Sequence, residues 1–383
     1  MFQKLKNVYH LFQAILANII YGFPSRRLKV IGVTGTDGKT TTTHLIAHIL
    51  KSTNRKVSYV SSVYASIAGK EYDIGFHVTT PSPFSLEKFL KQSADNKDEY
   101  FILETTSHAL DQNRVWGIIY EIGVLTNVTH EHLDYHKDYE EYLRTKVSLL
   151  EMAKISIVNE DDESFSYLSQ KLKGKSQKYN SKLKILDELP SLTKFNQYNY
   201  SAAYTVCKQL GLNDEEILRG MSTFKLPKGR LELVYDKGFK VIIDFAHTPN
   251  AFANLLPEIR KKYLKKGGKL IHVFGSAGLR DFTKRPLMGL MSSKYADQII
   301  LTEEDFRTEK PEDICKQIIS GIENDRPYKV IINREQAIFK AIAMAKKGDA
   351  VVLTGKSHEK SLCRGKTEYP WSEHEAVIKA LNL

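Results

Sequence analysis

One stretch near the start of the chain constrains the fold most strongly. Residues 30–33 form a largely β-branched apolar run typical of a buried strand, and Gly35 and Gly38 follow it closely. Lys39 then precedes a helical segment, 41–50, whose apolar residues recur at helical spacing. A strand, a glycine loop, Lys-Thr and a helix together form a layout in which loop amides and the helix N-terminus hold phosphate oxygens. The stretch therefore predicts a nucleoside triphosphate site.

The spacing within this loop indicates which kind of nucleotide loop it is. The longer pattern with four residues between its glycines fails, because Val33 stands five residues before Gly38, and the shorter G-T-x-G-K-T form fits instead. The dinucleotide fingerprint also fails on glycine spacing. We expect Lys39 to reach the β- and γ-phosphates, and Thr40 or Thr41 to offer a hydroxyl to Mg²⁺.

Composition narrows the partners and the compartment. The chain has 383 residues, which suggests two or three domains, and a net charge of +11. Its lysines are scattered and form no stripe with aromatic residues, so a polyanionic small substrate is favoured over nucleic acid. The three cysteines, Cys207, Cys315 and Cys363, lie far apart, which argues against a disulfide framework or a zinc ribbon. We therefore expect a cytoplasmic protein.

Residues 1–23 precede the first strand and are partly apolar. Their apolar run, from Leu11 to Phe23, is too short to span a bilayer and lacks a convincing cleavage site for a signal peptide. One helical face would carry Leu5, Val8, Phe12, Ile15 and Ile19. We expect a helix packed on the following domain, with interfacial membrane contact as the alternative.

Strand and helix patterns alternate along most of the chain, which predicts a mostly parallel sheet with helices on both faces. The candidate strands of the first block are 29–34, 56–60, 100–104, 121–126 and 155–158. A second α/β block starts near Leu233, after the turn at 227–229, and residues 171–195 read as a Lys-rich surface excursion. We predict an α/β protein with a lead-in at 1–28, a P-loop domain at 29–232 and a Rossmann-like domain at 233–383.

Polar residues with chemical potential follow several of these strands. Glu104 ends an apolar strand, where ligands of open α/β sheets bind, so it is a candidate Mg²⁺ ligand as well as a candidate surface acid. Residues 126–136 hold three histidines, but without H-E-x-x-H spacing, so Mg²⁺ is favoured over zinc. Lys146 lies on the predicted helix 138–151 and by itself reads as a surface lysine. Thr79-Thr80-Pro81 reads as a helix start.

Taken in order, these motifs resemble the Mur ligase family, and within it the UDP-MurNAc-tripeptide synthetases. The resemblance rests on the loop 34–41, Thr79-Thr80-Pro81, Glu104 with 107–110, 132–136, Phe195-Asn196 with Asn199, Gly229-Arg230 with Glu232, Asp244 with 246–249, Phe274-Gly275, Arg280-Asp281, 284–289, and Gly355-Lys356 with His358-Glu359. It implies an ATP-dependent ligase that activates a carboxylate as an acyl phosphate and adds a diamino acid to a cell-wall precursor peptide.

The resemblance also implies a role for each matching residue. The implied ATP site comprises Gly35, Thr36, Asp37, Gly38, Lys39, Thr40, Thr41, Asn196, Asn199, Arg230 and Asp244. The implied catalytic residues are Lys39, Glu104, His132 and Lys146. The implied Mg²⁺ ligands are Thr40, Glu104, His132 and Lys146, the last as a carbamate. The implied contacts to a UDP-MurNAc-peptide-like acceptor are Thr79, Thr80, Ser107 and Arg114.

The implied amino-acid pocket is the most informative part. It comprises Arg280, Asp305, Arg307, Gly355 and Glu359. Two arginines suit a substrate with two carboxylates, and Glu359 suits its distal ammonium group. Where the family's diaminopimelate enzymes carry D-N-P-R, this chain has Glu304-Asp305-Phe306-Arg307, and Asp305 could neutralise Arg307 by pairing with it. The resemblance therefore favours meso-diaminopimelate and leaves lysine or ornithine open.

Only residues 1–28 stand where the family has a domain that binds the uridine end of the acceptor. Either the uridine goes unrecognised, a partner supplies that surface, or the acceptor is not a UDP-sugar. Rival functions are a MurT-like amidating subunit, a polyglutamyl-type ligase and an inactive nucleotide-binding scaffold. Four-cysteine zinc ribbons typify the MurT-like subunits, and retention of Lys39 and Glu104 argues against the scaffold. We expect a monomer that binds no nucleic acid.

Overall fold

The structure is a computed structural model that describes residues 2–75, 79–129, 135–172, 176–190, 192–323 and 325–382, with the backbone alone at Phe2 and Lys4. The chain forms two compact units, and the main division between them falls between Lys225 and Leu226. The domain limits expected from the sequence, including the one at 232/233, stay predictions. Among the described residues, no helix combines the length and apolar content that crossing a bilayer requires.

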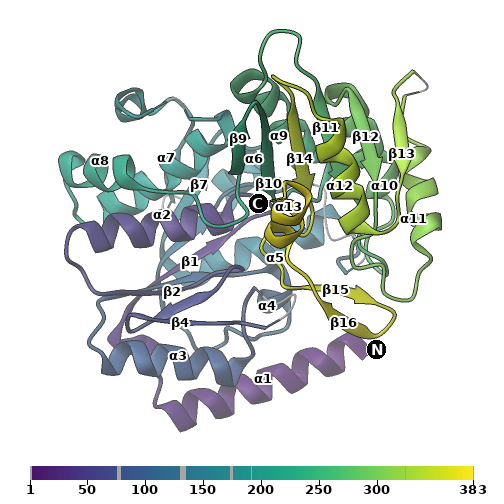
Figure 1. Cartoon of the computed structure of the whole chain (residues 1–383). Helices are drawn as coiled ribbons and strands as arrows, with labels where there is room; N and C mark the ends of the chain where they lie inside the picture. The colour runs from purple at the N-terminus through teal and green to yellow at the C-terminus, as the bar shows by residue number, and fades with distance from the viewer. Residues whose placement is uncertain are drawn as a thin grey trace. The chain divides into compact units, whose positions relative to one another are not determined.

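Unit 1 is built on an eight-stranded sheet with the strand order β4-β3-β2-β5-β1-β6-β7-β8 (Figure 1). The strands are β1 (Lys29–Thr34), β2 (Val57–Val60), β3 (Ala65–Ile67), β4 (Lys70–Tyr72), β5 (Tyr100–Glu104), β6 (Tyr120–Leu125), β7 (Ala153–Asn159) and β8 (Ser176–Tyr179). All neighbouring pairs from β2 to β8 are parallel, whereas β3 and β4 form an antiparallel edge. Because β1 lies between β5 and β6, the residues that follow these three strands meet at one edge of the sheet.

Helices cover both faces of this sheet. They are α1 (Phe2–Tyr21), η1 (Pro24–Arg27), α2 (Lys39–Ser52), α3 (Pro83–Asp95), α4 (Ser107–Asp111), α5 (Tyr139–Met152), α6 (Phe165–Lys171), η2 (Lys184–Glu188), α7 (Lys194–Gln209) and α8 (Asp214–Thr223). Alternate residues of β1 enter different cores: Ile31 packs with residues of α2, α7 and α8, whereas Val30 packs with residues of α3. The alternating pattern of the sequence is therefore confirmed as a two-sided, mostly parallel sheet.

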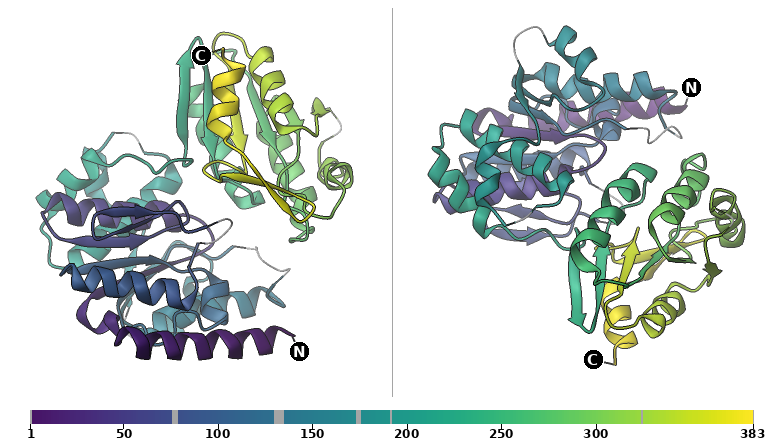
Figure 2. Two further views of the ribbon diagram at one scale, coloured as in Figure 1. Left: turned by 60° about the horizontal axis from the view of Figure 1, so that its bottom comes forward. Right: turned by 90° about the horizontal axis from the view of Figure 1, so that it is seen from above.

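Unit 2 contains a six-stranded sheet with the order β13-β12-β11-β14-β10-β9 (Figure 1). A separate hairpin, β15-β16, is drawn in yellow near the C-terminal end of the chain (Figure 2). The strands are β9 (Glu232–Lys237), β10 (Phe239–Asp244), β11 (Leu270–Phe274), β12 (Gln298–Leu301), β13 (Tyr328–Val330), β14 (Ala350–Thr354), β15 (Ser361–Arg364) and β16 (Thr367–Pro370). The helices are α9 (Pro249–Tyr263), α10 (Lys284–Tyr295), α11 (Pro311–Ile319), α12 (Arg334–Met344) and α13 (Glu373–Ala380). The sheet is parallel except at β9, so the predicted second α/β block is confirmed.

Two predictions about local structure are wrong. Residues 171–195 are not a surface excursion, because they include β8, which pairs with β7, and the core residues Tyr179 and Leu186. The sequence did not indicate this strand, because its two middle residues, Gln177 and Lys178, are polar and exposed and only Tyr179 is buried. The second error concerns the face of α1: the expected packing of this helix on the domain is confirmed by its contacts with α3, but the residues buried there are Ala14 and Ala17 and not the face that carries Phe12.

Candidate active site

The phosphate loop, residues 35–38, joins the end of β1 to the start of α2. Gly38 has a left-handed backbone, with φ of 83°, which glycine adopts without steric cost. A Cβ atom at Gly35 would collide with Thr126 Oγ1, and one at Gly38 would collide with Asn199 Oδ1. Both glycines are therefore needed for the close approach of the loop to its neighbours, which leaves the first amides of α2 at the mouth of the loop.

Two lysine side chains converge on this loop. Lys39 Nζ donates hydrogen bonds to the carbonyl oxygens of Gly35, at 2.9 Å, and Thr36, at 2.7 Å. Lys146, from α5, donates to the same Gly35 oxygen at 2.6 Å, and its Nζ lies 4.3 Å from the centre of the Tyr142 ring. Lys146 is 2% exposed, so its interpretation as a surface lysine is wrong. Two cations near one carbonyl oxygen repel each other, and an anion placed between them would be attracted to both.

A second group of side chains gathers oxygen atoms beside the loop. Thr40 Oγ1 donates to Glu104 Oε1 at 3.1 Å and lies 2.9 Å from Ser62 Oγ, while the Ser62 amide donates to Glu104 Oε2 at 2.9 Å. Thr40 and Glu104 are both buried. A carboxylate and hydroxyls form a donor set that suits Mg²⁺. The structure thus brings together two of the predicted metal ligands, and the predicted surface position of Glu104 is excluded.

His132 lies outside the described residues, so its predicted role stays a prediction. No group of three or more His, Cys, Asp or Glu side chains in the described ranges is arranged to hold a metal. Nearby, the His136 ring packs against the ring of Tyr142, with centroids 5.1 Å apart. Burial and the neighbouring Lys146 cation lower the pKa of His136. This histidine is therefore neutral at physiological pH.

Three side chains that the sequence analysis missed hold the loop in place. Asn127 accepts a hydrogen bond from the Asp37 amide at 2.9 Å and donates one to the Asp37 carbonyl at 3.1 Å. Thr126 Oγ1 donates to the same carbonyl at 2.6 Å, and the Tyr142 hydroxyl lies 3.2 Å from Thr36 Oγ1. Thr126 and Asn127 directly follow β6. The rule that selected Glu104, which looks beyond the carboxyl ends of parallel strands, would have found them too.

The two asparagines predicted for the nucleotide lie beside the loop. Asn196 and Asn199 are buried on α7, and Asn199 Nδ2 donates to Asn196 Oδ1 at 3.1 Å. Thr42 Oγ1, on α2, donates to Asn199 Oδ1 at 3.4 Å. The structure thus brings α7 against the first turn of α2, although the two segments are far apart in the sequence. Thr41, also on this turn, is buried.

The residues predicted for the acceptor form a second group beyond β5. Thr80 Oγ1 donates to the Glu104 carbonyl at 3.0 Å and accepts from the Thr106 amide at 3.1 Å. Arg114 donates to the Thr80 carbonyl at 3.4 Å, and Ser107 is the first residue of α4. Thr79 lies next to Thr80 and is half-buried. This group therefore adjoins Glu104, which belongs to the oxygen-rich site.

In unit 2, Arg230 and Asp244 lie near the end of β10. The Arg230 guanidinium stacks over the Phe245 ring at 4.7 Å, and its Nη1 lies 3.5 Å from His358 Nδ1. Asp244 accepts hydrogen bonds from the amides of Leu231, at 2.6 Å, and Ala246, at 2.7 Å. Asp244 therefore fixes the turn that carries Arg230. The predicted contact of both residues with a nucleotide stays a prediction.

A buried charge cluster occupies the predicted amino-acid pocket of unit 2. Lys356 Nζ donates to both carboxylate oxygens of Asp305 at 2.9 Å and pairs with Glu359 at 2.5 Å. The Cys363 amide also donates to Asp305, at 2.8 Å. Burial lowers the pKa of Lys356, but the carboxylates of Glu359 and Asp305 outweigh burial and raise it. These contacts do not support the expected pairing of Asp305 with Arg307, because Lys356 neutralises Asp305.

Arg307 is held by its backbone beside this cluster. Its φ of 52° is unusual for a residue with a side chain, and its amide and carbonyl bond to Cys363 and Gly365 of the β15-β16 hairpin at 3.1 and 2.7 Å. Arg307 Nη1 donates to the Gly278 carbonyl at 2.6 Å. Gly278 belongs to the loop that follows β11 and leads to the exposed Arg280. The two predicted arginines therefore come from neighbouring segments.

Glu304 is a further residue to which the sequence analysis gave no role. It is buried, and its Oε2 atom has no hydrogen-bond partner among the described residues. A Cβ atom at Gly355 would lie 2.7 Å from that oxygen. Burial, and then the neighbouring Asp305, raise the pKa of Glu304. A buried carboxyl oxygen without a partner is costly, and a ligand ammonium group at this place would relieve the cost.

Comparisons of the sequence and of the structure with known proteins agree with each other. The family model described as "Mur ligase middle domain" matches residues 33–185, and "Mur ligase, glutamate ligase domain" matches residues 229–357. A protein from Aquifex aeolicus named UDP-N-acetylmuramoyl-L-alanyl-D-glutamate–2,6-diaminopimelate ligase is 38% identical, over 95% of this chain and 80% of its own length. A Clostridium acetobutylicum protein of the same name, numbered 1, is 36% identical over the same shares.

Comparison with solved structures agrees with the comparison of sequences. A structure of a UDP-N-acetylmuramoyl-L-alanyl-D-glutamate–2,6-diaminopimelate ligase is similar with a TM-score of 0.59 at 27% identity, covering 93% of this chain and 78% of the other. FolC of E. coli, in complex with DHPP and ADP, gives a TM-score of 0.73 at 20% identity, with 91% and 90% covered. The second likeness concerns the fold alone. It confirms the α/β architecture.

Proposed function

The chain belongs to the Mur ligase family, and on that premise we propose that it is an ATP-dependent ligase that adds meso-diaminopimelate to a UDP-MurNAc-dipeptide-like acceptor. The observation that carries this proposal is the arrangement at one edge of the first sheet. There the glycine loop, the cations of Lys39 and Lys146, and the oxygens of Thr40 and Glu104 adjoin the group around Thr80. Such an edge can hold a triphosphate next to a carboxylate that is to be activated.

The proposed reaction has two steps. In the first, an oxygen of the acceptor carboxylate attacks the γ-phosphorus of ATP, the bond to the β-phosphate oxygen breaks, and ADP and an acyl phosphate result. In the second, the amino nitrogen attacks the acyl carbon, the carbon–oxygen bond to phosphate breaks, and the nitrogen loses a proton as the amide forms. Loop amides and Lys39 would hold the phosphates in line, because the charge shifts among these oxygens as the reaction proceeds.

Mg²⁺ would be held by Thr40 and Glu104, with His132 as a further proposed ligand. When bound, it would neutralise phosphate charge and polarise the phosphorus–oxygen bond. The buried hydroxyl and carboxylate, 3.1 Å apart, are compatible with such an ion. Ser62, through its amide and hydroxyl, would keep the Glu104 carboxylate oriented.

Lys146 is proposed to act as a carbamate. As an ammonium group it would be a second cation near the Gly35 oxygen that Lys39 already contacts. Loss of one proton gives the free amine, and addition of CO₂ to its Nζ with loss of a second proton gives the carbamate, so the cation becomes an anion and repulsion becomes attraction to Lys39 and to a metal ion.

Rescue experiments distinguish the two charge states of Lys146. Lys146→Ala should lower ligase kcat by about a hundredfold or more, as for loss of one preorganised electrostatic group. Acetate or formate should restore part of the activity if the working group is an anion. Lys154→Ala, at an exposed lysine of β7, is the matched control and should keep full activity. Rescue by methylamine and not by acetate would contradict the carbamate.

Unit 2 supports the choice of a diamino acid with two carboxylates. Arg280 and Arg307 offer two cations from neighbouring segments, and Glu304 offers a buried carboxylate next to Gly355. Lys356 already pairs with Asp305 and Glu359. Asp305 therefore neutralises the Arg307 cation less than the sequence suggested, and more of the charge of Arg307 is available to the substrate. We propose that Arg307 binds the distal carboxylate and that Glu304 and Glu359 face the distal ammonium group.

The acceptor end is supported by the group around Thr80. We propose that Thr79, Thr80, Ser107 and Arg114 contact the sugar, its phosphates or the peptide. The proposed domain roles follow: residues 29–232 bind ATP and the acceptor, and residues 233–383 bind the amino acid. Arg230 and Asp244 are proposed to contact the nucleotide. A cytoplasmic location and a monomeric state stay predictions.

Phosphate release in a three-substrate assay tests the proposed function. The protein is incubated with ATP and Mg²⁺, and UDP-MurNAc-L-Ala-D-Glu and meso-diaminopimelate are supplied singly and together. We expect phosphate release and a product with the summed mass only when all substrates are present. Lys39→Ala should lower kcat by about 10²–10³-fold, whereas Lys51→Ala, at the other end of α2, should not. Release that is independent of acceptor and amino acid would contradict a ligase.

A further inference from the structure

Helix α1 presents its large apolar side chains outward. Leu5, Val8, Phe12 and Ile19 are each 60–64% exposed. Ala14, Ala17 and Asn18 are instead buried, on the side where α1 packs against α3 (Figures 1 and 2). Among the side chains of α1 that the structure describes, Lys6 is the one charged group that is classed as exposed. A helix on a solvated surface normally points its polar face outward, so this face is suited to being covered.

The apolar surface continues beyond α1. Trp116 and Ile119, in the loop before β6, are 39% and 45% exposed. Asn18 Nδ2 donates to the Trp116 carbonyl at 2.9 Å, and the Ile119 amide donates to Ser25 Oγ at 3.4 Å. These bonds fix the loop to α1 and to the segment that follows it. We call the set Leu5, Val8, Tyr9, Phe12, Leu16, Ile19, Ile20, Trp116 and Ile119 the α1 patch.

The charged residues of α1 and of the segment after it have one sign, although Asn7 donates a hydrogen bond to Asp111 at 3.1 Å. The first acidic residue of the chain is Asp37, so α1 and the segment after it contain none. Lys6 lies at one end of α1, and Arg26 and Arg27 lie just beyond the other end and are exposed. Arg26 stacks over the Phe23 ring at 4.4 Å, whereas Arg27 pairs with Asp95 on the surface. Apolar residues with a tryptophan, flanked by basic residues, match the interface of an anionic bilayer.

We propose that the α1 patch docks unit 1 on a lipid bilayer that carries anionic headgroups. The helix lies on the surface rather than crossing it, because its opposite side is buried against α3. A second copy of the chain is a less suitable occupant, because two such patches would bring like charges at their ends together. The proposal does not rest on the ligase activity, because none of these residues belongs to the candidate active site.

Vesicle flotation with the full chain tests this proposal. Vesicles of equal parts phosphatidylglycerol and phosphatidylcholine are compared with pure phosphatidylcholine vesicles, at low and high salt. We expect binding to the anionic vesicles that falls as salt rises, and at least tenfold weaker partition to the neutral ones. Equal binding to both would overturn the anionic surface, and no binding to either would overturn the docking.

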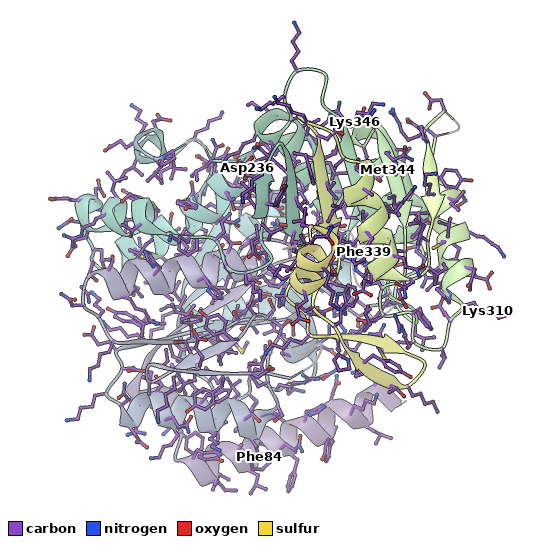
Figure 3. All side chains as sticks on the ribbon, in the orientation of Figure 1. Phe84, Asp236, Lys310, Phe339, Met344 and Lys346 are labelled. Atoms are coloured by element: carbon purple, nitrogen blue, oxygen red, sulfur yellow. The ribbon has the colours of Figure 1, made fainter. Side chains whose placement is uncertain are left out.

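Two substitutions locate the binding surface. Phe12→Ser should weaken partition to anionic vesicles by about tenfold, since it removes one large apolar side chain from the patch. Phe339→Ser is the matched control, because this residue lies on α12 of unit 2, is 40% exposed and is far from α1 in the sequence (Figure 3). Arg26→Glu should weaken binding to anionic vesicles alone. Sedimentation velocity completes the test: a dimer that Phe12→Ser dissociates, without vesicle binding, would assign the patch to a second copy and overturn the proposal.

Discussion

The phosphate loop of unit 1 and the amino-acid region of unit 2 are held in place by different chemistry. Apart from Lys39 and Lys146, which donate to its carbonyl oxygens, neutral groups fix the loop: Thr126, Asn127 and Asn199 contact its backbone or its glycines through hydroxyl and amide atoms. Charged pairs fix the region in unit 2, where Lys356 is buried between the carboxylates of Asp305 and Glu359. Because these supporting groups are neutral, the electrostatic field at the loop comes from Lys39, Lys146 and the ligand. In unit 2, internal pairing decides which charges are left for a substrate.

This difference predicts how each region responds to substitution. Removing one partner of a buried charge pair leaves an uncompensated charge, which is costly, whereas removing a neutral brace loses ordinary hydrogen bonds. A substitution in the buried charge pairs of unit 2 should therefore lower the free energy of unfolding more than a substitution at the neutral supports of the loop in unit 1.

The largest expected effect is at Asp305. Asp305→Ala should lower the free energy of unfolding by about 3 kcal/mol, because Lys356 then stays buried with one carboxylate fewer. Urea unfolding of purified protein measures this. The matched control is Asp313→Ala, which breaks an exposed Asp–Lys pair with Lys316 and should leave the free energy of unfolding almost unchanged. Equal losses at the two sites would mean that burial of the pair does not matter.

The sequence located the loop better than the amino-acid region, and the cause is physical. Gly35, Gly38 and Lys39 act within a few residues of one another, so a local pattern specifies them. The Lys356–Asp305 pair joins residues that are 51 positions apart, and no local pattern encodes their contact. Pairing of Asp305 with Arg307 was therefore the possibility that the sequence raised, because the two are neighbours in the sequence.

Burial explains the remaining errors. Lys146 was read as a surface lysine because its helix is amphipathic, and its tertiary contact with Gly35 overrides that pattern. The pattern of α1 predicted the helix, but it could not predict that Ala14 and Ala17 would face α3 while Phe12 faces outward. Periodicity predicts that a face exists, and the shape of the neighbouring element decides which face it accepts.

The pH dependence of stability adds to this comparison, because unit 1 contains a buried acid. Glu87, on α3, accepts a hydrogen bond from neutral Asn18 at 3.2 Å, and its Oε2 atom has no partner among the described residues. Burial raises the pKa of Glu87 from 4.5 to about 7, against the opposing bond from Asn18. The folded state therefore holds this proton to higher pH than the unfolded chain. Its contribution to stability is complete below about pH 4.5 and is lost as the pH rises to about 7.

Glu87→Gln should remove this loss. At pH 8 the variant should be more stable than the wild type by about 3 kcal/mol, and below pH 4 the two should be nearly equal. Thermal or urea unfolding across pH 4–8 measures the difference. Glu71→Gln, at an exposed acid of β4, should show no such trend. A constant difference at all pH values would indicate a packing effect and not titration.

The smallest expected stability effect is at the neutral brace. Asn127→Ala removes the two hydrogen bonds to Asp37 and should cost about 1–2 kcal/mol while raising KM for ATP. Asn254→Ala, on the exposed side of α9, is the control and should change neither quantity. If Asn127→Ala costs as much as Asp305→Ala, the distinction between neutral and charged support fails.

The choice of amino acid by Arg307 is the most direct test of the account. Wild-type protein and Arg307→Ala are each given UDP-MurNAc-L-Ala-D-Glu, ATP and equal amounts of meso-diaminopimelate and L-lysine, and the two products are separated by mass. We expect the wild type to incorporate diaminopimelate at least about tenfold in excess, because lysine would leave the guanidinium without its carboxylate, and Arg307→Ala to lose most of that preference. Excess incorporation of lysine by the wild type, with a ratio that Arg307→Ala does not change, would contradict the account.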